Sequence, residues 1–158
     1  MCGIAGFIDL RSGLSEDGRL HLLEQMICTL DHRGPDDRGK WTEPSFAVGL
    51  AQARLSIIDL SPLGRQPMTS ADSRITVVFN GEIYNFRELA RELKQAGYQF
   101  RTRCDTEVIL YAWQEWGEAC VQRFRGMFAF ALYDKTRQCL FLARDRLGVK
   151  PLFFSLVD

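Results

Sequence analysis

Apolar residues recur along this chain with several periods, and each period predicts a type of secondary structure. Apolar and small residues at 4–8 predict a buried first strand. After Ser15, which suits a helix N-cap, apolar positions at helical spacing predict a helix ending near His32. A polar loop is expected at 32–40. Apolar or β-branched runs predict later strands at residues 46–50, 55–60, 75–79, 127–133 and 139–143, with extended structure again at 149–154.

Two hairpins are predicted in the second half of the chain. Asn80-Gly81 follows the strand at 75–79 and leads into Glu82, Ile83 and Tyr84. This dipeptide favours a type I′ turn, because both positions tolerate positive φ. A second hairpin would join the strands at 127–133 and 139–143.

Two helices are expected between these hairpins. Asn85 with Glu88 three residues later resembles a capping box, which would open a helix over 86–96. Asp105 stands where an N-cap belongs, before a second helix ending at Gly117. With no repeat or linker in the chain, we expect one α+β domain of two sheets with helices outside them.

Composition excludes several classes of function. Twenty Lys and Arg balance twenty Asp and Glu, so no field of one sign attracts nucleic acid or an anionic membrane. No apolar stretch approaches the roughly 18 residues of a membrane helix, and a cytoplasmic protein is expected. The five cysteines are odd in number and contain no C-x-x-C pair, and the two histidines are isolated. We therefore predict no disulfide framework and no metal site, and interpret Cys28, Cys120 and Cys139 as packed thiols.

Cys2, directly after the initiator methionine, is the strongest candidate for chemistry. Removal of Met1 would place a thiol and a free α-amine on one residue. The amine has an ordinary pKa of about 7.7 to 8.0, so it can take the thiol proton and return it to a leaving group. This is the arrangement of an N-terminal nucleophile. Taken alone, Cys2 would favour the simpler interpretation of a packed cysteine at the start of a strand, and the rest of the chain reverses that preference.

Several sequence runs, in order, resemble the class II glutamine amidotransferase domain. The resemblance is closest to the amino-terminal glutaminase domain of glutamine-hydrolysing asparagine synthetases, and it covers residues 1 to about 154. It implies the four-layer αββα sandwich of N-terminal nucleophile hydrolases. The runs are MCGIAGF at 1–7, HRGPDD at 32–37, RLSIIDL at 54–60, FNGEIYNFREL at 79–89, DTEVIL at 105–110, RGMFAFALYD at 125–134 and ARDRLGVKPLF at 143–153.

The resemblance implies a role for each matching residue. Cys2 would attack the side-chain amide of glutamine and form a γ-glutamyl thioester, while the Asn80 amide and the Gly81 backbone N–H would hold the oxyanion. A hairpin turn at Asn80-Gly81 is compatible with that role. Arg54 would bind the α-carboxylate of glutamine and Asp105 its ammonium group. By spacing alone these two would be a surface charge and a helix cap.

Further substrate contacts are implied at Glu82 and in the segment after Arg54, which comprises Leu55, Ser56, Ile57 and Ile58. His32 lies in a loop that the family places near the pocket, and we assign it no catalytic role. Many relatives have His two residues before the arginine of the RLSIIDL run, whereas this chain has Gln52. Because Gln cannot become charged, we expect altered tuning of a pocket hydrogen bond rather than lost activity.

Residues 1–158 are thus interpreted as an amidotransferase domain that uses no cofactor. The ATP and magnesium of the resembled synthetases belong to a second, C-terminal domain, whose pyrophosphate-binding loop does not occur in this sequence. We expect glutamine and that synthetase domain as partners, with self-association as a further option, and aspartate or another acid as the ammonia acceptor. Two alternatives remain: a catalytically silent regulatory domain and a self-processing hydrolase of another amide.

Overall fold

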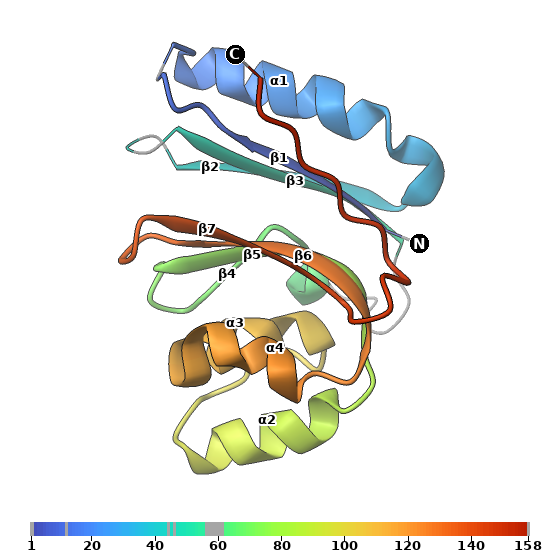
Figure 1. The fold of residues 1–158 in the computed structure, drawn as a ribbon, viewed down its shortest axis with the longest axis vertical. Helices are drawn as coiled ribbons and strands as arrows, with labels where there is room; N and C mark the ends of the chain where they lie inside the picture. Colours follow the sequence, from blue (N-terminus) through green and yellow to red (C-terminus); the bar gives the residue numbers. More distant parts are fainter. Residues whose placement is uncertain (1, 12, 44, 46, 56–61, 158) are drawn as a thin grey trace.

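Two antiparallel sheets lie face to face, and helices cover their outer surfaces (Figure 1). The structure is a computed structural model that describes residues 2–11, 13–43, 45, 47–55 and 62–157. The four layers, from α1 through the two sheets to the group of α2, α3 and α4, confirm the predicted αββα sandwich of the α+β class.

The first sheet has the strand order β1-β3-β2. Its strands are β1 (Gly3–Ile8), β2 (Asp37–Glu43) and β3 (Val48–Arg54). Side chains of β3 alternate between its two faces. Ala51 and Ala53 pack against α1 (Glu16–Cys28), whereas Val48 and Leu50 pack between the sheets. By the same alternation, Gln52 and Arg54 belong to the face between the sheets.

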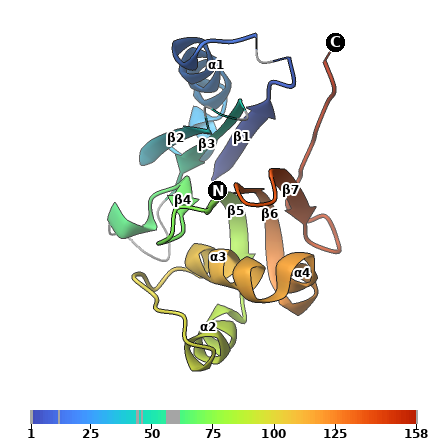
Figure 2. The ribbon, with the colours of Figure 1, turned by 90° about the vertical axis from the view of Figure 1, so that its left-hand side faces the viewer.

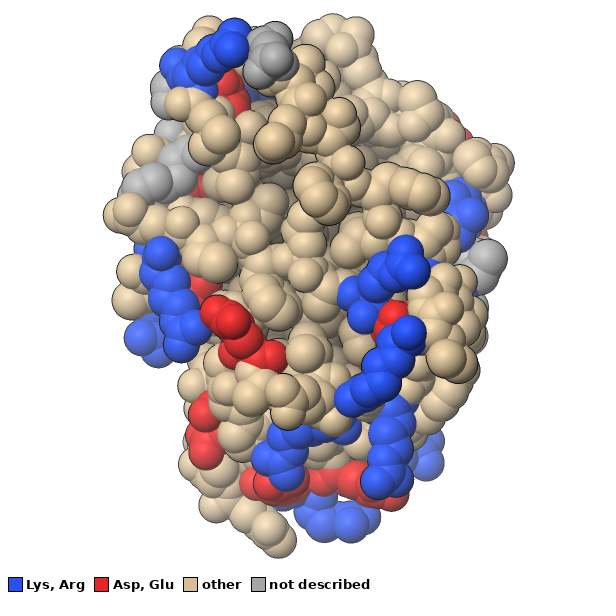
Figure 3. Space-filling view, in the orientation of Figure 1, with Lys and Arg blue, Asp and Glu red and all other residues tan. Residues whose placement is uncertain are grey.

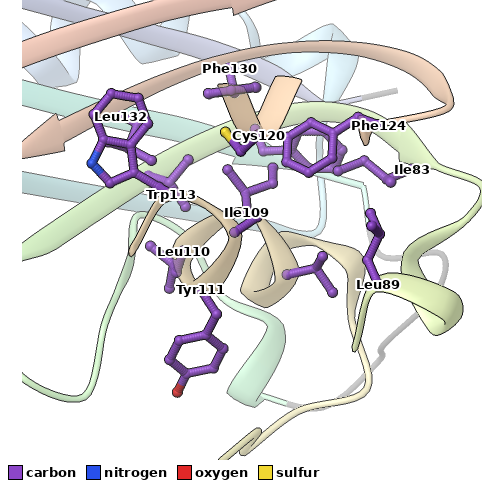
Figure 4. Close-up of a cluster of buried hydrophobic side chains, with 14 of the residues drawn as sticks. Ile83, Leu89, Ile109, Leu110, Tyr111, Trp113, Cys120, Phe124, Phe130 and Leu132 are labelled. Atoms are coloured by element: carbon purple, nitrogen blue, oxygen red, sulfur yellow. The ribbon is translucent and has the colours of Figure 1, made fainter. Parts of the chain in front are cut away.

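The second sheet has the order β4-β5-β6-β7. Its strands are β4 (Met68–Thr69), β5 (Ile75–Ile83), β6 (Gly126–Asp134) and β7 (Cys139–Arg144). The outer layer consists of α2 (Phe86–Gln95), α3 (Asp105–Trp116) and α4 (Cys120–Arg123). The largest core cluster lies between these helices and the sheet, and Figure 4 shows α3 side chains at its centre.

Beyond β7 the chain leaves both sheets. From residue 151 it runs past them as an extended, mostly exposed segment (Figures 1 and 2). The prediction of extended structure at 149–154 holds only in that sense, because residues 151–157 join no strand.

The predicted turn at Asn80-Gly81 is wrong. Both residues lie inside β5, where Asn80 pairs with Ala129 and Gly81 with Phe128. Nine consecutive pairs join β5 to β6, and this long-range pairing outweighs the local preference of Asn-Gly for a turn. The second predicted hairpin is confirmed as β6 and β7.

Boundaries also differ in the first half of the chain. The helix after Ser15 is confirmed, with the Ser15 hydroxyl accepting the Gly18 N–H at 3.2 Å, but it ends at Cys28. The expected loop at 32–40 contains the first residues of β2, which pair with β3. The strand expected at 46–50 continues to Arg54, and of the strand expected at 55–60, residues 56–60 lie outside the described residues.

Two predicted helix caps are replaced by other contacts. The Asn85 side chain makes no cap hydrogen bond and instead binds the carbonyl of Arg123 and the N–H of Arg125. Cys104, not Asp105, is the N-cap residue of α3. Among the thiols predicted to be packed, Cys120 is buried and Cys139 is partly buried, but Cys28 is exposed and its Sγ atom contacts Glu24 and Arg38.

Candidate active site

A pocket of about 120 Å³ lies where β1 begins, β3 ends and α3 begins. Figure 2 shows the start of β1 next to β5. Every predicted site residue that the structure describes lines this pocket. These residues are Cys2, Arg54, Leu55, Asn80, Gly81, Glu82 and Asp105, while Ser56, Ile57 and Ile58 lie outside the described residues.

Cys2 is held at the pocket by the end of β3. Its Sγ atom accepts the Leu55 N–H at 3.4 Å and lies 3.6 Å from the Leu55 carbonyl oxygen. The Arg33 Nε–H donates to the Cys2 carbonyl at 3.2 Å. The run that begins at His32 therefore contacts Cys2 through Arg33. Gly34 is needed beside it, because a Cβ there would lie 2.3 Å from the Ala53 carbonyl.

The edge of β5 opposite β6 supplies backbone donors to the pocket. Phe128, the partner of Gly81, directs its own N–H and carbonyl to Asp145, on the side away from β5. The pair of Gly81 and Phe128 is therefore a non-hydrogen-bonded one, and the Gly81 N–H points away from β6. On that side β4 covers only Thr76 and Val77. The Gly81 N–H is thus directed into the pocket.

Gly81 is required by space rather than by backbone angle. A Cβ at this position would lie 2.2 Å from the Met127 carbonyl oxygen and 2.6 Å from the Phe128 Cα. Any side chain would therefore force β5 away from β6. This close approach explains a glycine in mid-strand.

Asp105 is the buried acidic group of the pocket and is only 4% exposed, whereas Glu82, which also lines the pocket, is only partly buried. Its Oδ2 atom accepts the Ile83 N–H at 3.0 Å, on the same edge of β5. Burial raises the pKa of the carboxyl to about 6, although the N–H groups of Ile83, Asp105 and Thr106 oppose that rise. The carboxylate is therefore ionised at neutral pH.

Two buried cations share the pocket with this carboxylate. Arg54, at the end of β3, and Lys150, which is 4% exposed, both line it. Lys150 is placed by Asp145, whose side chain accepts the backbone N–H groups of Phe128, Leu147, Val149 and Lys150. Sequence patterns did not single out Lys150, because a lysine inside a loop signals a solvated charge.

Two glutamine side chains complete the pocket wall. Gln52 Nε2 donates to the Phe79 carbonyl at 2.9 Å, so the residue that replaces the family's usual His still makes a hydrogen bond at the pocket. Gln66 Oε1 accepts the Phe79 N–H at 2.7 Å, and Gln66 Nε2 donates to Thr106 Oγ1 at 3.0 Å. Sequence reasoning missed Gln66 and Thr106. In the sequence, Gln66 stands in the Gly- and Pro-containing run SPLGRQP at 61–67, and Thr106 directly follows Asp105.

In the part of the chain that the structure describes, no group of three His, Cys, Asp or Glu side chains is arranged to hold a metal ion, and no helix has the length and apolar composition of a membrane span. On the face in Figure 3, basic and acidic side chains intermix. This face shows no field of one sign that would attract a polyanion.

Comparison with known proteins agrees with this geometry. A family profile described as glutamine amidotransferase domain matches residues 1–158. The chain belongs to the glutamine amidotransferase domain family. It is 43% identical over 157 residues to asparagine synthetase [glutamine-hydrolyzing] 3 of Bacillus subtilis, covering 98% of this chain and 25% of that protein. It is 38% identical to amidase chry2 of Gibberella zeae, covering 99% of this chain and 24% of that protein.

The fold of this amidotransferase domain also occurs in a solved structure. Glutamine phosphoribosylpyrophosphate amidotransferase from B. subtilis superposes with a TM-score of 0.66 at 17% identity, over 95% of this chain and 38% of that one. This likeness concerns the fold alone. The chain spans about a quarter of the length of the two relatives named above, so it corresponds to one domain of such proteins.

Proposed function

We propose that this domain hydrolyses L-glutamine to glutamate and ammonia through a thioester on Cys2. The observation that carries the proposal is one pocket that holds a thiol, an exposed backbone N–H, a side-chain amide, a buried Arg and a buried Asp. A nucleophile, an oxyanion site and charges for an amino acid are what this reaction needs.

Removal of Met1 would give Cys2 a free α-amine. The amine takes the thiol proton, and the sulfur attacks the side-chain amide carbon of glutamine to form a tetrahedral oxyanion. The Asn80 amide and the Gly81 N–H donate hydrogen bonds to that oxygen. The C–N bond then breaks, and the amine returns the proton to the departing ammonia. Water attacks the thioester, releases glutamate and restores the thiol.

Arg54 and Asp105 supply charges opposite to those of the amino-acid end of glutamine. The planar guanidinium of Arg54 can bind both oxygens of the α-carboxylate. The Asp105 carboxylate, ionised at neutral pH, can bind the α-ammonium. Glu82 and Leu55 line the same pocket and are assigned to substrate contacts, as is the segment at 56–58.

The ammonia would serve a synthetase domain that lies outside these residues. Support comes from the greater length of the relatives and from an exposed apolar segment after β7. Its large apolar side chains are Leu147, Val149, Phe153, Phe154, Leu156 and Val157. ATP and magnesium would act in that second domain, most simply for the amidation of aspartate, whereas glutamine hydrolysis needs no cofactor. We assign the protein to the cytoplasm, and self-association is open to direct measurement.

The test is covalent labelling with 6-diazo-5-oxo-L-norleucine, a reactive glutamine analogue, followed by intact-mass measurement and peptide mapping. We expect loss of Met1, one adduct on Cys2 that glutamine blocks, and glutamate release that the Cys2→Ala variant lacks. Loss of Met1 with neither adduct nor glutamate would refute the proposal and favour the silent regulatory domain. If Met1 is retained, the measurement is repeated after its enzymatic removal.

A further inference from the structure

Gln66 connects two parts of the pocket that would bind opposite ends of glutamine. Its side chain is buried, 9% exposed, and both ends of its amide are used. The carbonyl oxygen accepts the Phe79 N–H on β5, and the amide nitrogen donates to the Thr106 hydroxyl on α3. Phe79 directly precedes the oxyanion donors Asn80 and Gly81.

The contact with Phe79 replaces part of a missing strand. β4 pairs with β5 only at Val77 and Thr76, so beyond Val77 no strand among the described residues pairs with this edge of β5. Gln66 lies two residues before the start of β4 and meets the Phe79 N–H with a side-chain oxygen. Gln52, from the other sheet, meets the Phe79 carbonyl. Side chains therefore hold both the N–H and the carbonyl of Phe79, the residue before Asn80.

The contact with Thr106 fixes the other end of the pocket. Thr106 follows Asp105 in the first turn of α3, so its position sets that of the carboxylate. Asp105 also accepts the Ile83 N–H, so β5 and α3 are joined on both sides of the Gly81 N–H. The two connections enclose the stretch of β5 that faces the substrate.

We propose that Gln66 is a positioning residue that fixes the distance between the oxyanion donors on β5 and the ammonium-binding carboxylate on α3. The inference rests on the proposed function. Glutamine has a short side chain, so its amide carbon meets the oxyanion donors only if its ammonium group is held at a matching distance. A misplacement of about 1 Å can lower a rate by about 100-fold.

The experiment uses steady-state glutaminase kinetics of the 158-residue chain, corrected for the folded fraction measured by circular dichroism. Gln66→Met keeps the length of the side chain and removes both hydrogen bonds. We expect kcat to fall by about 10- to 100-fold. Thr106→Val leaves the contact with Phe79 and loosens only the carboxylate end, so it should raise KM more than it lowers kcat.

A matched control separates positioning from general loosening of α3. Tyr111→Phe removes hydrogen bonds from the same helix to the Gln99 carbonyl and to Glu107 Oε1, neither of which lines the pocket, and should leave kcat and KM within about twofold of wild type. In the double variant of Gln66 and Thr106, the second change should add little, because their shared bond is already lost.

The outcomes distinguish this proposal from the proposed function. A folded Gln66→Met variant with wild-type kcat and KM overturns the positioning role while the glutaminase function stands. An equal loss in Tyr111→Phe overturns it as well. If Gln66→Met does not fold, an unchanged KM in Thr106→Val is the refuting result. A wild-type chain that neither labels at Cys2 nor releases glutamate removes the proposed function, and the positioning role with it.

Discussion

Replacing Asp105 with Asn separates the energetic cost of burying this carboxylate from its use in binding. The side chain is 4% exposed, and burial raises its pKa from 3.8 to about 6. The Asp105 side chain accepts the Ile83 N–H, and an Asn side chain keeps an oxygen that can do the same. The variant therefore removes the charge and leaves the hydrogen bond.

The size and sign of the effect follow from the raised pKa. Each pKa unit corresponds to about 1.36 kcal/mol, so the rise from 3.8 to about 6 destabilises the folded state by about 3 kcal/mol once the carboxyl is ionised. The folded state holds the proton more tightly than the unfolded one. The free energy of unfolding therefore falls as pH rises from about 4 to about 6, and this contribution is constant above that range.

We expect Asp105→Asn to be more stable than wild type at pH 8 by up to about 3 kcal/mol, and nearly equal to it at pH 4. Urea unfolding at the two pH values measures this difference. Glutamine should protect wild type against unfolding at pH 8 but not the variant, which has lost the anion opposite the ammonium group. The KM of wild type for glutamine should rise as pH falls below about 6.

Asp145→Asn is a control of opposite sign. Burial opposes the ionisation of Asp145, but the backbone N–H groups of Lys150, Val149, Phe128 and Leu147 outweigh it and lower the pKa. That stabilisation is present above the unfolded pKa and is lost as pH falls through the folded one, so this variant should be less stable at neutral pH. An Asp105→Asn protein that is less stable at pH 8, or equally shifted at both pH values, would refute the reasoning.

Two further substitutions test the packing around the pocket. Gly81→Ala places a Cβ 2.2 Å from the Met127 carbonyl oxygen, so β5 must move by about 1 Å. We expect the free energy of unfolding in urea to fall by about 1–3 kcal/mol and kcat to fall by about 100-fold, and near-wild-type values of both would contradict this prediction. Glu107→Gln points an amide that carries two N–H donors at the N–H groups of Arg101 and Thr102. We expect the free energy of unfolding in the same assay to fall by about 1–3 kcal/mol. The KM of the folded protein should be unchanged, because Glu107 does not line the pocket.

The sequence supports the layers of the fold better than the local turns. The helical spacing after Ser15 and the β-branched run before Asn80 reflect burial, which is a property of the whole fold and is visible in one sequence. The Asn-Gly dipeptide was misread, because its preference for a turn is local and small. Pairing with a strand about 50 residues later, at Phe128 and Ala129, overrode it.

Some residues of the candidate site could likewise be predicted from the sequence, and others could not. Cys2 and Arg54 could be named because their residue types suit the chemistry and their surrounding runs match a known family. Gln66 could not be named, because its function depends on where two other elements come to lie. A glutamine in a Gly- and Pro-containing loop has the composition of a solvated side chain, and only the fold shows that it is buried.

The incomplete edge of β5 explains how one strand can serve both folding and chemistry. A full neighbouring strand would have used the N–H groups of Phe79, Gly81 and Ile83 in a ladder. In this structure β4 stops short, and side chains of Gln66 and Asp105 take the first and third of these donors. The middle donor, at Gly81, then faces the pocket between two fixed neighbours. Rigid placement of that donor follows from satisfying the groups on either side of it, so a variant that frees either neighbour should impair the reaction even though it leaves Gly81 in place.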